Sequence, residues 1–299
     1  MNPNRITNTA AAVLLTGALM LTSCSSNTQT HYEGRADRHY RAAFTDAGSA
    51  GRLRGRSVVV SIFASDPVYE WNFDRDDKAS EKTICSFLDM AANYLQSTAE
   101  SYGVKTVFVT DFVEHPDLFY TMSTDEVITD ESVLYDDTIE QAAWDFIDNN
   151  IDEQSIRDEY RADNVIYMMF MNTDVRTDAV SCTRSWYPGM PSDAEVVFLF
   201  NYDYGLLNPP AVYAHEILHT FGAPDLYSSS ESYNITDEFV EYAELNLPNE
   251  IMLTCSDPQS GDYLYDDIVN EVSELTAYYV GLTDRSDIVD EWGLTDPTR

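Results

Sequence analysis

The sequence predicts one α/β domain that ends in a helical part. Short runs rich in β-branched and aromatic residues, typical of buried strands, alternate with longer segments whose apolar residues recur at helical spacing. After the last strand-like run, only helical patterns follow. This order, β-α-β-α-β-β and then helices, is that of one α/β domain with a helical carboxy-terminal part. The 299 residues are long enough for a sizeable core.

The elements can be placed by their apolar patterns. Strands are expected at 57–64 (SVVVSIFA), 104–112, 164–171 and 195–202. Helices are expected at 81–102, 136–149, 152–161, 209–221, 236–245 and 267–280. The stretch 172–194 is expected to be a long loop.

The helix at 209–221 has clear boundary signals. Asn208 is placed to cap it, and the two prolines that follow suit a first helical turn. Gly222 stands where a left-handed residue is expected to end the helix. Its apolar stripe leaves two histidines, and the glutamate next to the first of them, on the other face.

The amino-terminal residues predict export. Residues 1–24 combine a positive start, the apolar run Ala10–Leu21 and the closing sequence LTSC, as a signal peptide does. LTSC resembles the bacterial lipobox, which implies that Cys24 is lipidated and tethers the protein outside the cell; without lipidation the protein would be secreted. Residues 25–54 are polar and rich in small residues, so we expect a flexible tether, and residues 55–299 form the expected domain.

The charge balance excludes some partners. The formal net charge is −35, so the surface repels nucleic acid and anionic lipid headgroups. The acidic clusters Asp74–Asp77, Asp136–Asp137 and Asp266–Asp267 suit either a solvated surface or calcium, which takes carboxylate oxygens. The oligomeric state does not follow from the sequence.

Three cysteines follow Cys24, so at most one internal disulfide can form among them. Cys182 and Cys255 fall in loop-like sequence, whereas Cys85 lies in a helical pattern and suits a core position. A Cys182–Cys255 disulfide is therefore the expected pairing.

The stretch AHEILHTFGAPDLY at 214–227 predicts a metal site. His215 and His219 are four residues apart, so both imidazoles lie on one helix face and can reach one ion. Glu216 completes an HExxH motif, in which the glutamate serves as general base while the ion lowers the pKa of a water molecule. Asp225, beyond the glycine turn, adds a hard oxygen ligand. Two imidazoles and a carboxylate leave the fourth position of zinc open, as in catalytic sites.

HEILHTFGAPD resembles the long zinc-binding consensus of the metzincin peptidases. Most metzincins have histidine at the last position, and the aspartate here is similar to snapalysin-like and immune-inhibitor-A-like members. The resemblance implies a zincin-like fold with a mixed twisted sheet, an active-site helix and a helical carboxy-terminal subdomain. It also implies that His215, His219 and Asp225 bind zinc, that Glu216 is the base, and that Met252 forms a turn beneath the zinc.

The resemblance extends to substrate binding. It implies that the run at 195–202 is the edge strand along which an extended peptide pairs. The tyrosine that some metzincins carry two residues after the methionine is replaced here by Thr254, so the group that stabilises the oxyanion is unassigned. Tyr227, close to Asp225 in the sequence, is one candidate.

Several alternatives stay open at this point. Glu238 lies 19 residues after His219, near the spacing at which gluzincins place a glutamate ligand. The favoured function is a lipid-anchored zinc endopeptidase that acts on proteins or peptides. The alternative is an inactive surface protein that binds a partner or captures metal on a peptidase fold, and a weaker third is hydrolysis of a different bond. Glu216 favours catalysis, because a metal-capturing protein needs no base there.

Overall fold

The computed structural model describes residues 48–74, 77–134, 137–173, 181–184, 195–203 and 205–297. The expected signal peptide at 1–24, with Cys24, and residues 25–47 of the expected tether lie outside these ranges. None of the helices in the described part of the chain is long and apolar enough to cross a membrane.

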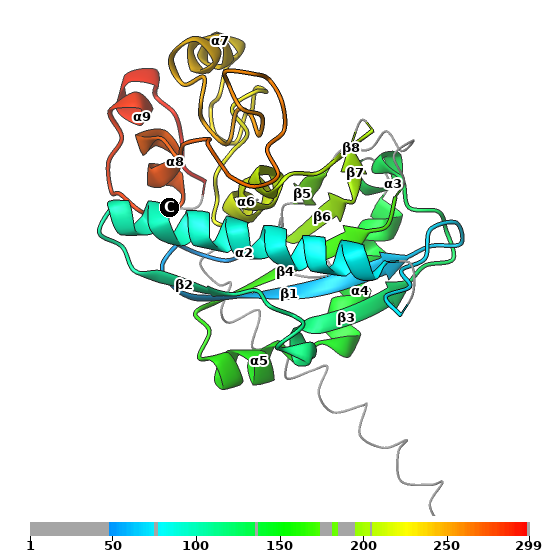
Figure 1. Cartoon of the computed structure of the whole chain (residues 1–299). Helices are drawn as coiled ribbons and strands as arrows, with labels where there is room; N and C mark the ends of the chain where they lie inside the picture. Colours follow the sequence, from blue (N-terminus) through cyan, green and yellow to red (C-terminus); the bar gives the residue numbers. More distant parts are fainter. Residues whose placement is uncertain are drawn as a thin grey trace, which may run out of the picture.

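A mixed sheet runs through the middle of the domain (Figure 1). Its strands are β1 (Gly55–Ser65), β2 (Thr106–Val109), β3 (Phe119–Ser123), β4 (Asn164–Met171), β5 (Cys182–Arg184) and β6 (Val196–Phe200). The order is β2-β1-β4-β6-β5, and β3 also pairs with β1, alongside its second half. All of these pairs are parallel except β5 with β6, which is antiparallel. The predicted α/β class with a mixed sheet is therefore confirmed.

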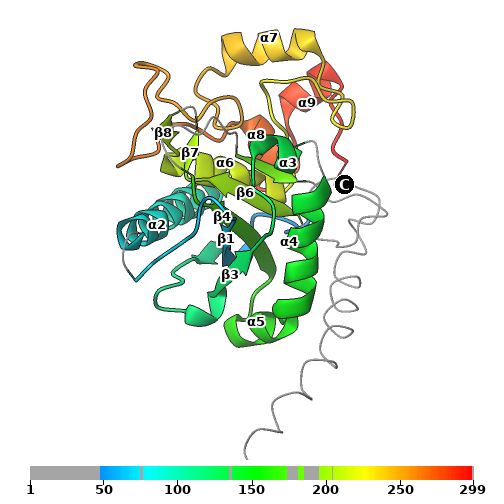
Figure 2. The same ribbon diagram turned by 90° about the vertical axis from the view of Figure 1, so that its right-hand side faces the viewer.

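Helices cover both faces of the sheet (Figure 2). Helices α2 (Lys78–Ser101) and α6 (Pro210–Thr220) share one core with Val59 and Phe63 of β1. Helices α3 (Asp130–Leu134), α4 (Asp137–Asn150) and α5 (Glu153–Tyr160) share the other core with the alternate residues of the same strand, Val58, Val60 and Ile62. Because both faces are covered, the central strands are continuously apolar.

Two strands of the main sheet were not predicted from the sequence. Strand β3 has a single buried residue, Met122, so its apolar pattern is weak. Strand β5 has only three residues, and it lies inside the stretch 172–194 that was expected to be a loop. As a result, β6 is an inner strand between β4 and β5, and the prediction that 195–202 forms the sheet edge is wrong.

The carboxy-terminal part is helical, as predicted. It contains α7 (Asp237–Asn246), α8 (Glu274–Tyr279) and α9 (Asp287–Trp292), which pack on the α2 and α6 side through residues such as Phe239 and Leu275. The helix expected at 267–280 is shorter than predicted, because Glu250 accepts hydrogen bonds from Ser273 N (2.7 Å) and Thr276 Oγ1 (3.0 Å) at its start. The short elements η2 (Pro116–Leu118), β7 (Tyr202–Asp203) and β8 (Leu206–Leu207) complete the fold.

The packed chain begins earlier than the sequence predicted. Residues 48–54 were expected to belong to the tether, yet Ala50 and Leu53 are 4% and 0% exposed. Ala50 N donates to the carbonyl of Thr220 (2.9 Å), and Leu53 N donates to that of Val280 (2.9 Å). The domain therefore reaches back at least to Gly48.

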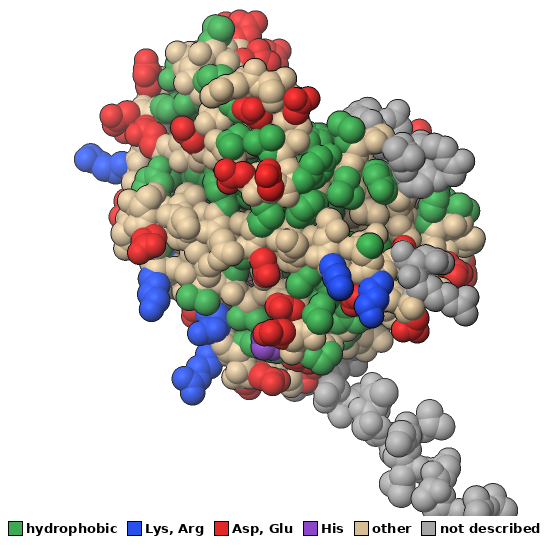
Figure 3. Space-filling model, viewed as in Figure 1, with side chains coloured by type: hydrophobic (Ala, Val, Ile, Leu, Met, Phe, Trp, Pro, Cys, Tyr) green, Lys and Arg blue, Asp and Glu red, His purple; other side chains and the backbone are tan. Residues whose placement is uncertain are grey.

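Acidic side chains are numerous on the molecular surface, as the net charge of −35 requires (Figure 3). On the face shown, many of them lie on the lobe formed by α7 and α9, and others are dispersed over the rest. Lys and Arg side chains are few on this face.

Candidate metal centre

Helix α6 carries the HExxH residues in a buried position. His215 and Glu216 are 5% and 4% exposed, although the sequence placed them opposite the apolar stripe. The segment around Ile251 packs over His215, and Thr183 on β5 (Cys182–Arg184) packs against Glu216. Asn208 does not cap the helix as predicted: its Nδ2 donates to the carbonyl of Phe200 (2.7 Å), and Pro209 occupies the N-cap position.

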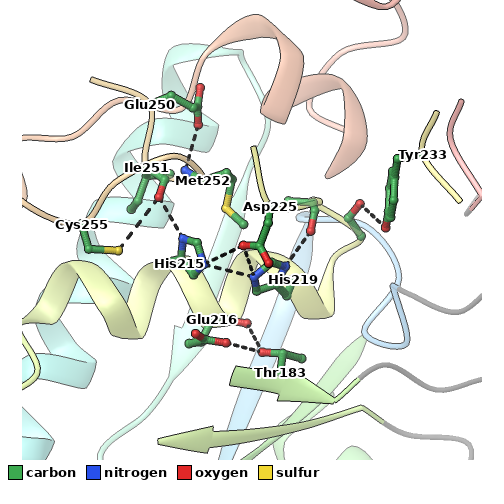
Figure 4. Close-up of polar contacts among 12 residues, drawn as sticks. Thr183, His215, Glu216, His219, Asp225, Tyr233, Glu250, Ile251, Met252 and Cys255 are labelled. Atoms are coloured by element: carbon green, nitrogen blue, oxygen red, sulfur yellow. Dashed lines mark hydrogen bonds and ion pairs between the residues drawn. The ribbon is translucent and has the colours of Figure 1, made fainter. Parts of the chain in front are cut away.

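Three predicted ligands converge on one point (Figure 4). The Nε2 atoms of His215 and His219 are 3.1 Å apart. Asp225 Oδ1 lies 3.2 Å from the first and 3.1 Å from the second. Ligand atoms bound to tetrahedral zinc at about 2.0–2.1 Å are about 3.3–3.4 Å from one another. The observed triangle is close to this size.

The hydrogen bonds on the far side of each imidazole determine what faces the triangle. His215 Nδ1 lies 2.9 Å from the carbonyl of Ile251, and His219 Nδ1 lies 2.8 Å from the carbonyl of Ala223. A carbonyl can only accept, so both Nδ1 atoms donate, and each neutral ring directs the Nε2 lone pair inward. Asp225 Oδ1 is buried without a hydrogen-bond donor. With neutral rings, three acceptors therefore face one another, an arrangement that a proton or a metal ion would stabilise.

The pKa directions agree with this reading. Burial alone would lower the pKa of His219, but the Asp225 carboxylate raises it above its ordinary value. Burial would raise the pKa of Asp225, but His219 and His215 hold it well below its usual range. Both shifts show that the cluster stabilises positive charge, which a proton or a metal ion can supply.

The turn after α6 brings Asp225 back to the histidines. Gly222 has a φ of 95°, a conformation that residues other than glycine rarely adopt, as the sequence predicted. The hydroxyl of Tyr233 donates to the carbonyl of Gly222 (3.1 Å) and supports the turn. Leu226 N then donates to the carbonyl of Met252 (2.9 Å), which fixes the chain next to Asp225.

Met252 lies in a tight turn beside the ligands. Leu253 N and Thr254 N both donate to the carbonyl of Glu250 (3.0 Å each), which closes the turn. Met252 is fully buried, and its side chain points toward His215 and Asp225 (Figure 4). The structure therefore brings Met252, for which the metzincin resemblance implies a turn beneath zinc, next to the candidate ligands.

Glu216 lies next to the ligands and is held by a neighbour from the sheet. His215, Glu216 and His219 each offer a ligand atom within 4.8 Å of the others. The hydroxyl of Thr183 on β5 lies 2.7 Å from Glu216 Oε2 and 3.0 Å from the Glu216 carbonyl. Sequence reasoning missed Thr183, because a strand of three residues carries too short a pattern to be recognised.

A cavity of about 410 Å³ opens beside these residues. Edge strand β5 lines one side through Thr183 and Arg184, and the segment after α6 lines the other. Tyr227 also lines it: its ring stacks on that of His215 at 6.4 Å between centroids, and the side chain is 52% exposed. Partial burial, Asp225 and Glu216 all raise the pKa of Tyr227, so its hydroxyl stays protonated and can donate a hydrogen bond.

Other predicted residues lie elsewhere. Glu238, the alternative ligand, is exposed on α7 and does not join the His215–Glu216–His219 group. Asp266 and Asp267 are exposed, and calcium binding at the acidic clusters stays a prediction; Asp76, Asp136 and the Asp137 side chain lie outside the described part of the chain.

The expected Cys182–Cys255 disulfide is absent from this structure, in which both residues are free thiols. Cys182 packs against the core that contains residues of α3, α4 and α5, and Cys255 packs against the opposite core, which contains residues of α2 and α6. The sheet therefore separates the two side chains.

Comparison with protein-family models and with curated proteins finds no match for this chain.

Proposed function

We propose that this chain is a zinc-dependent endopeptidase of the metzincin type. The observation that carries the proposal is the triangle of acceptors formed by His215, His219 and Asp225, with edges of 3.1–3.2 Å. Two neutral imidazoles and a carboxylate match the ligand set of catalytic zinc. Asp225 Oδ1 is buried and has no hydrogen-bond donor, which fits a bound cation.

Glu216 is the proposed general base. When bound, zinc would act as a Lewis acid on the scissile carbonyl and lower the pKa of a water molecule. Glu216 takes the proton from the attacking water and delivers it to the leaving nitrogen. Thr183 positions the carboxylate for this transfer through its 2.7 Å contact with Oε2.

An extended peptide is the substrate that this site suits. Among the described strands, β5 is at the sheet edge and borders the cavity, so we expect a peptide backbone to pair with it in β-augmentation. This edge replaces the one expected at 195–202. The site of action remains the one proposed from the sequence: outside a bacterial cell, with a lipid on Cys24 as the membrane anchor.

The alternative is an inactive lipoprotein that captures metal or binds a partner on this fold. Such a protein would need the ligands His215, His219 and Asp225 but no general base. The buried Glu216 beside them and the cavity that opens onto it favour hydrolysis.

Cleavage of a mixed peptide library tests the proposal. We expect the zinc-loaded protein to cut peptides, and we expect Glu216→Gln to lose at least about a thousandfold in rate while it keeps one zinc per chain. Glu238→Gln, a change to an exposed acid on α7, should cut normally. Absence of cleavage by the zinc-loaded parent protein would favour the binding function.

A further inference from the structure

Glu250 is a buried carboxylate at the start of the turn that holds Met252, and it is 2% exposed. Its Oε2 accepts a hydrogen bond from Ser273 N (2.7 Å), and its Oε1 accepts one from Thr276 Oγ1 (3.0 Å). Oε1 also accepts a longer hydrogen bond from Met252 N (3.4 Å). Burial raises the pKa of Glu250, and these hydrogen bonds oppose the rise because they stabilise the ionised form. The start of α8 thus holds a carboxylate against the turn.

The hydrogen bond from Met252 N bears on the direction of the Ile251 carbonyl. Both groups belong to one trans peptide unit, in which the N–H and the C=O point in opposite directions. When the N–H points at Glu250 Oε1, the C=O points away from Glu250, and it accepts the 2.9 Å hydrogen bond from His215 Nδ1. Figure 4 shows Glu250 and His215 on opposite sides of this peptide. A single peptide unit therefore links the carboxylate to the imidazole.

This link acts on the nitrogen of His215 that faces the other ligands. A carboxylate beside a peptide N–H polarises the peptide and makes its carbonyl a stronger acceptor. A stronger acceptor at Nδ1 fixes the ring and raises the basicity of Nε2, the atom that lies 3.2 Å from Asp225 Oδ1. In many zinc sites a carboxylate accepts directly from a ligand imidazole. Here one peptide unit stands between them.

The second histidine lacks such a link. His219 Nδ1 lies 2.8 Å from the carbonyl of Ala223, and the next residue is Pro224, whose nitrogen carries no hydrogen. The 223–224 peptide therefore has no N–H to offer a carboxylate. The two rings of one site thus differ in what lies behind them, and His219 serves as an internal control for His215.

We propose that Glu250 is a positioning residue of the metal site: through the 251–252 peptide, its carboxylate orients His215 and strengthens the binding of this ring to zinc. The proposal rests on the zinc site of the proposed function and is independent of hydrolysis. It also gives the start of α8 a role in metal binding, because Ser273 and Thr276 hold the carboxylate in place.

Replacement of the carboxylate by an amide tests the proposal. Glu250→Gln nearly conserves the size of the side chain and removes its charge. In the zinc-loaded full chain, prepared with isotope-labelled histidine, the Nδ1–H proton resonance reports the hydrogen bond of each ligand ring. We expect the resonance of His215 to move upfield in the variant, while that of His219 stays in place. Competition with a zinc chelator should show a rise of about tenfold or more in the zinc dissociation constant.

Asp66→Asn is the matched control. Asp66 is 5% exposed, and its carboxylate accepts hydrogen bonds from Val68 N and Tyr69 N (2.7 Å each) and from Ile128 N (2.8 Å). None of these donors belongs to the metal site. A general loss of stability should lower the Tm of both metal-free variants. We expect the zinc dissociation constant and the His215 resonance of Asp66→Asn to match those of the parent.

An unchanged zinc dissociation constant and an unchanged His215 resonance in Glu250→Gln would overturn the proposal, as would an equal rise of the dissociation constant in Asp66→Asn. If Glu250→Gln does not fold, Thr276→Val decides: it removes the hydroxyl that holds Oε1 with little change of shape. We expect it to weaken zinc binding about threefold, and no change would again overturn the proposal. Failure of the parent chain to bind zinc would instead contradict the proposed function.

Discussion

His215 Nδ1 donates a hydrogen bond to the carbonyl of Ile251 across 2.9 Å, and this contact joins helix α6 to the turn that holds Met252. The residues are 36 positions apart in the chain. The bond fixes the ring orientation, and in the neutral ring it leaves the Nε2 lone pair directed toward Asp225 and His219. The position of the turn is therefore coupled to the geometry of the site.

Truncation of Met252 should weaken the fold. The side chain is fully buried, so Met252→Ala leaves a cavity, and we expect the free energy of unfolding to fall by about 2–5 kcal/mol. Met252→Leu nearly conserves volume and should cost less than about 1.5 kcal/mol. Denaturant unfolding of both metal-free variants checks the difference, and equal losses would show that the thioether itself matters more than the volume.

Loss of Asp225 should impair metal binding, and loss of Glu238 should not. Asp225 Oδ1 lies within 3.2 Å of both imidazole Nε2 atoms, whereas Glu238 is exposed on α7. We expect Asp225→Ala to weaken zinc binding by at least about a hundredfold, since it removes a direct ligand. Competition with a zinc chelator measures both variants. A severe loss only in Glu238→Ala would overturn the ligand assignment.

Removal of the Thr183 hydroxyl should slow catalysis under the proposed function. Thr183→Val removes the donor 2.7 Å from Glu216 Oε2 and keeps a similar shape, so we expect kcat to fall by about tenfold or more. Thr183→Ser retains the hydroxyl and should stay close to the parent. Zinc stoichiometry is measured in parallel, because a rate loss that followed lost zinc would argue against a role in positioning Glu216.

Metal removal should cost more stability at high pH than at low pH. In the metal-free protein the pKa of His219 is raised, so protonation stabilises the fold fully below its ordinary pKa of about 6.5. That stabilisation is lost as the pH rises through the raised value. Protons also compete with zinc for the rings at low pH. We expect the Tm difference between zinc-loaded and metal-free protein to widen by about 5 °C from pH 6 to pH 9 in a thermal scan; a constant difference would contradict the assignment.

Cys85 and Cys182 should be reduced and slow to react. Burial, with Asp111 and Asp89 nearby, raises the pKa of Cys85 to about 12, and burial and Glu216 raise that of Cys182. Thiolate is the reactive form, so we expect slow modification of these two thiols in the folded protein and prompt modification of Cys85, Cys182 and Cys255 after denaturation. Mass spectrometry after labelling with a thiol reagent gives the number of modified cysteines. A Cys182–Cys255 disulfide would leave Cys85 as the reactive one of these three residues.

Most of the fold could be predicted from local patterns. The buried strands β1, β4 and β6 and the long helices α2 and α4 have apolar runs or stripes long enough to recognise. Strand β5 could not be found, because its three residues become a strand only by pairing with β6. The shortened helix α8 likewise depends on Glu250, which lies far from it in sequence.

The sequence by itself determined which residues make up the candidate site: the spacing of His215 and His219 fixes both on one helix face with Glu216 adjacent, and Gly222 fixes a turn that returns Asp225. Only the tertiary structure decided how these groups are oriented and enclosed. The carbonyls of Ile251 and Ala223 select the ring tautomers, Thr183 reaches Glu216 from the sheet edge, and Glu250 binds the start of α8. Helical spacing is a local property of the backbone, whereas hydrogen bonds between distant segments form only when the packed core brings those segments together.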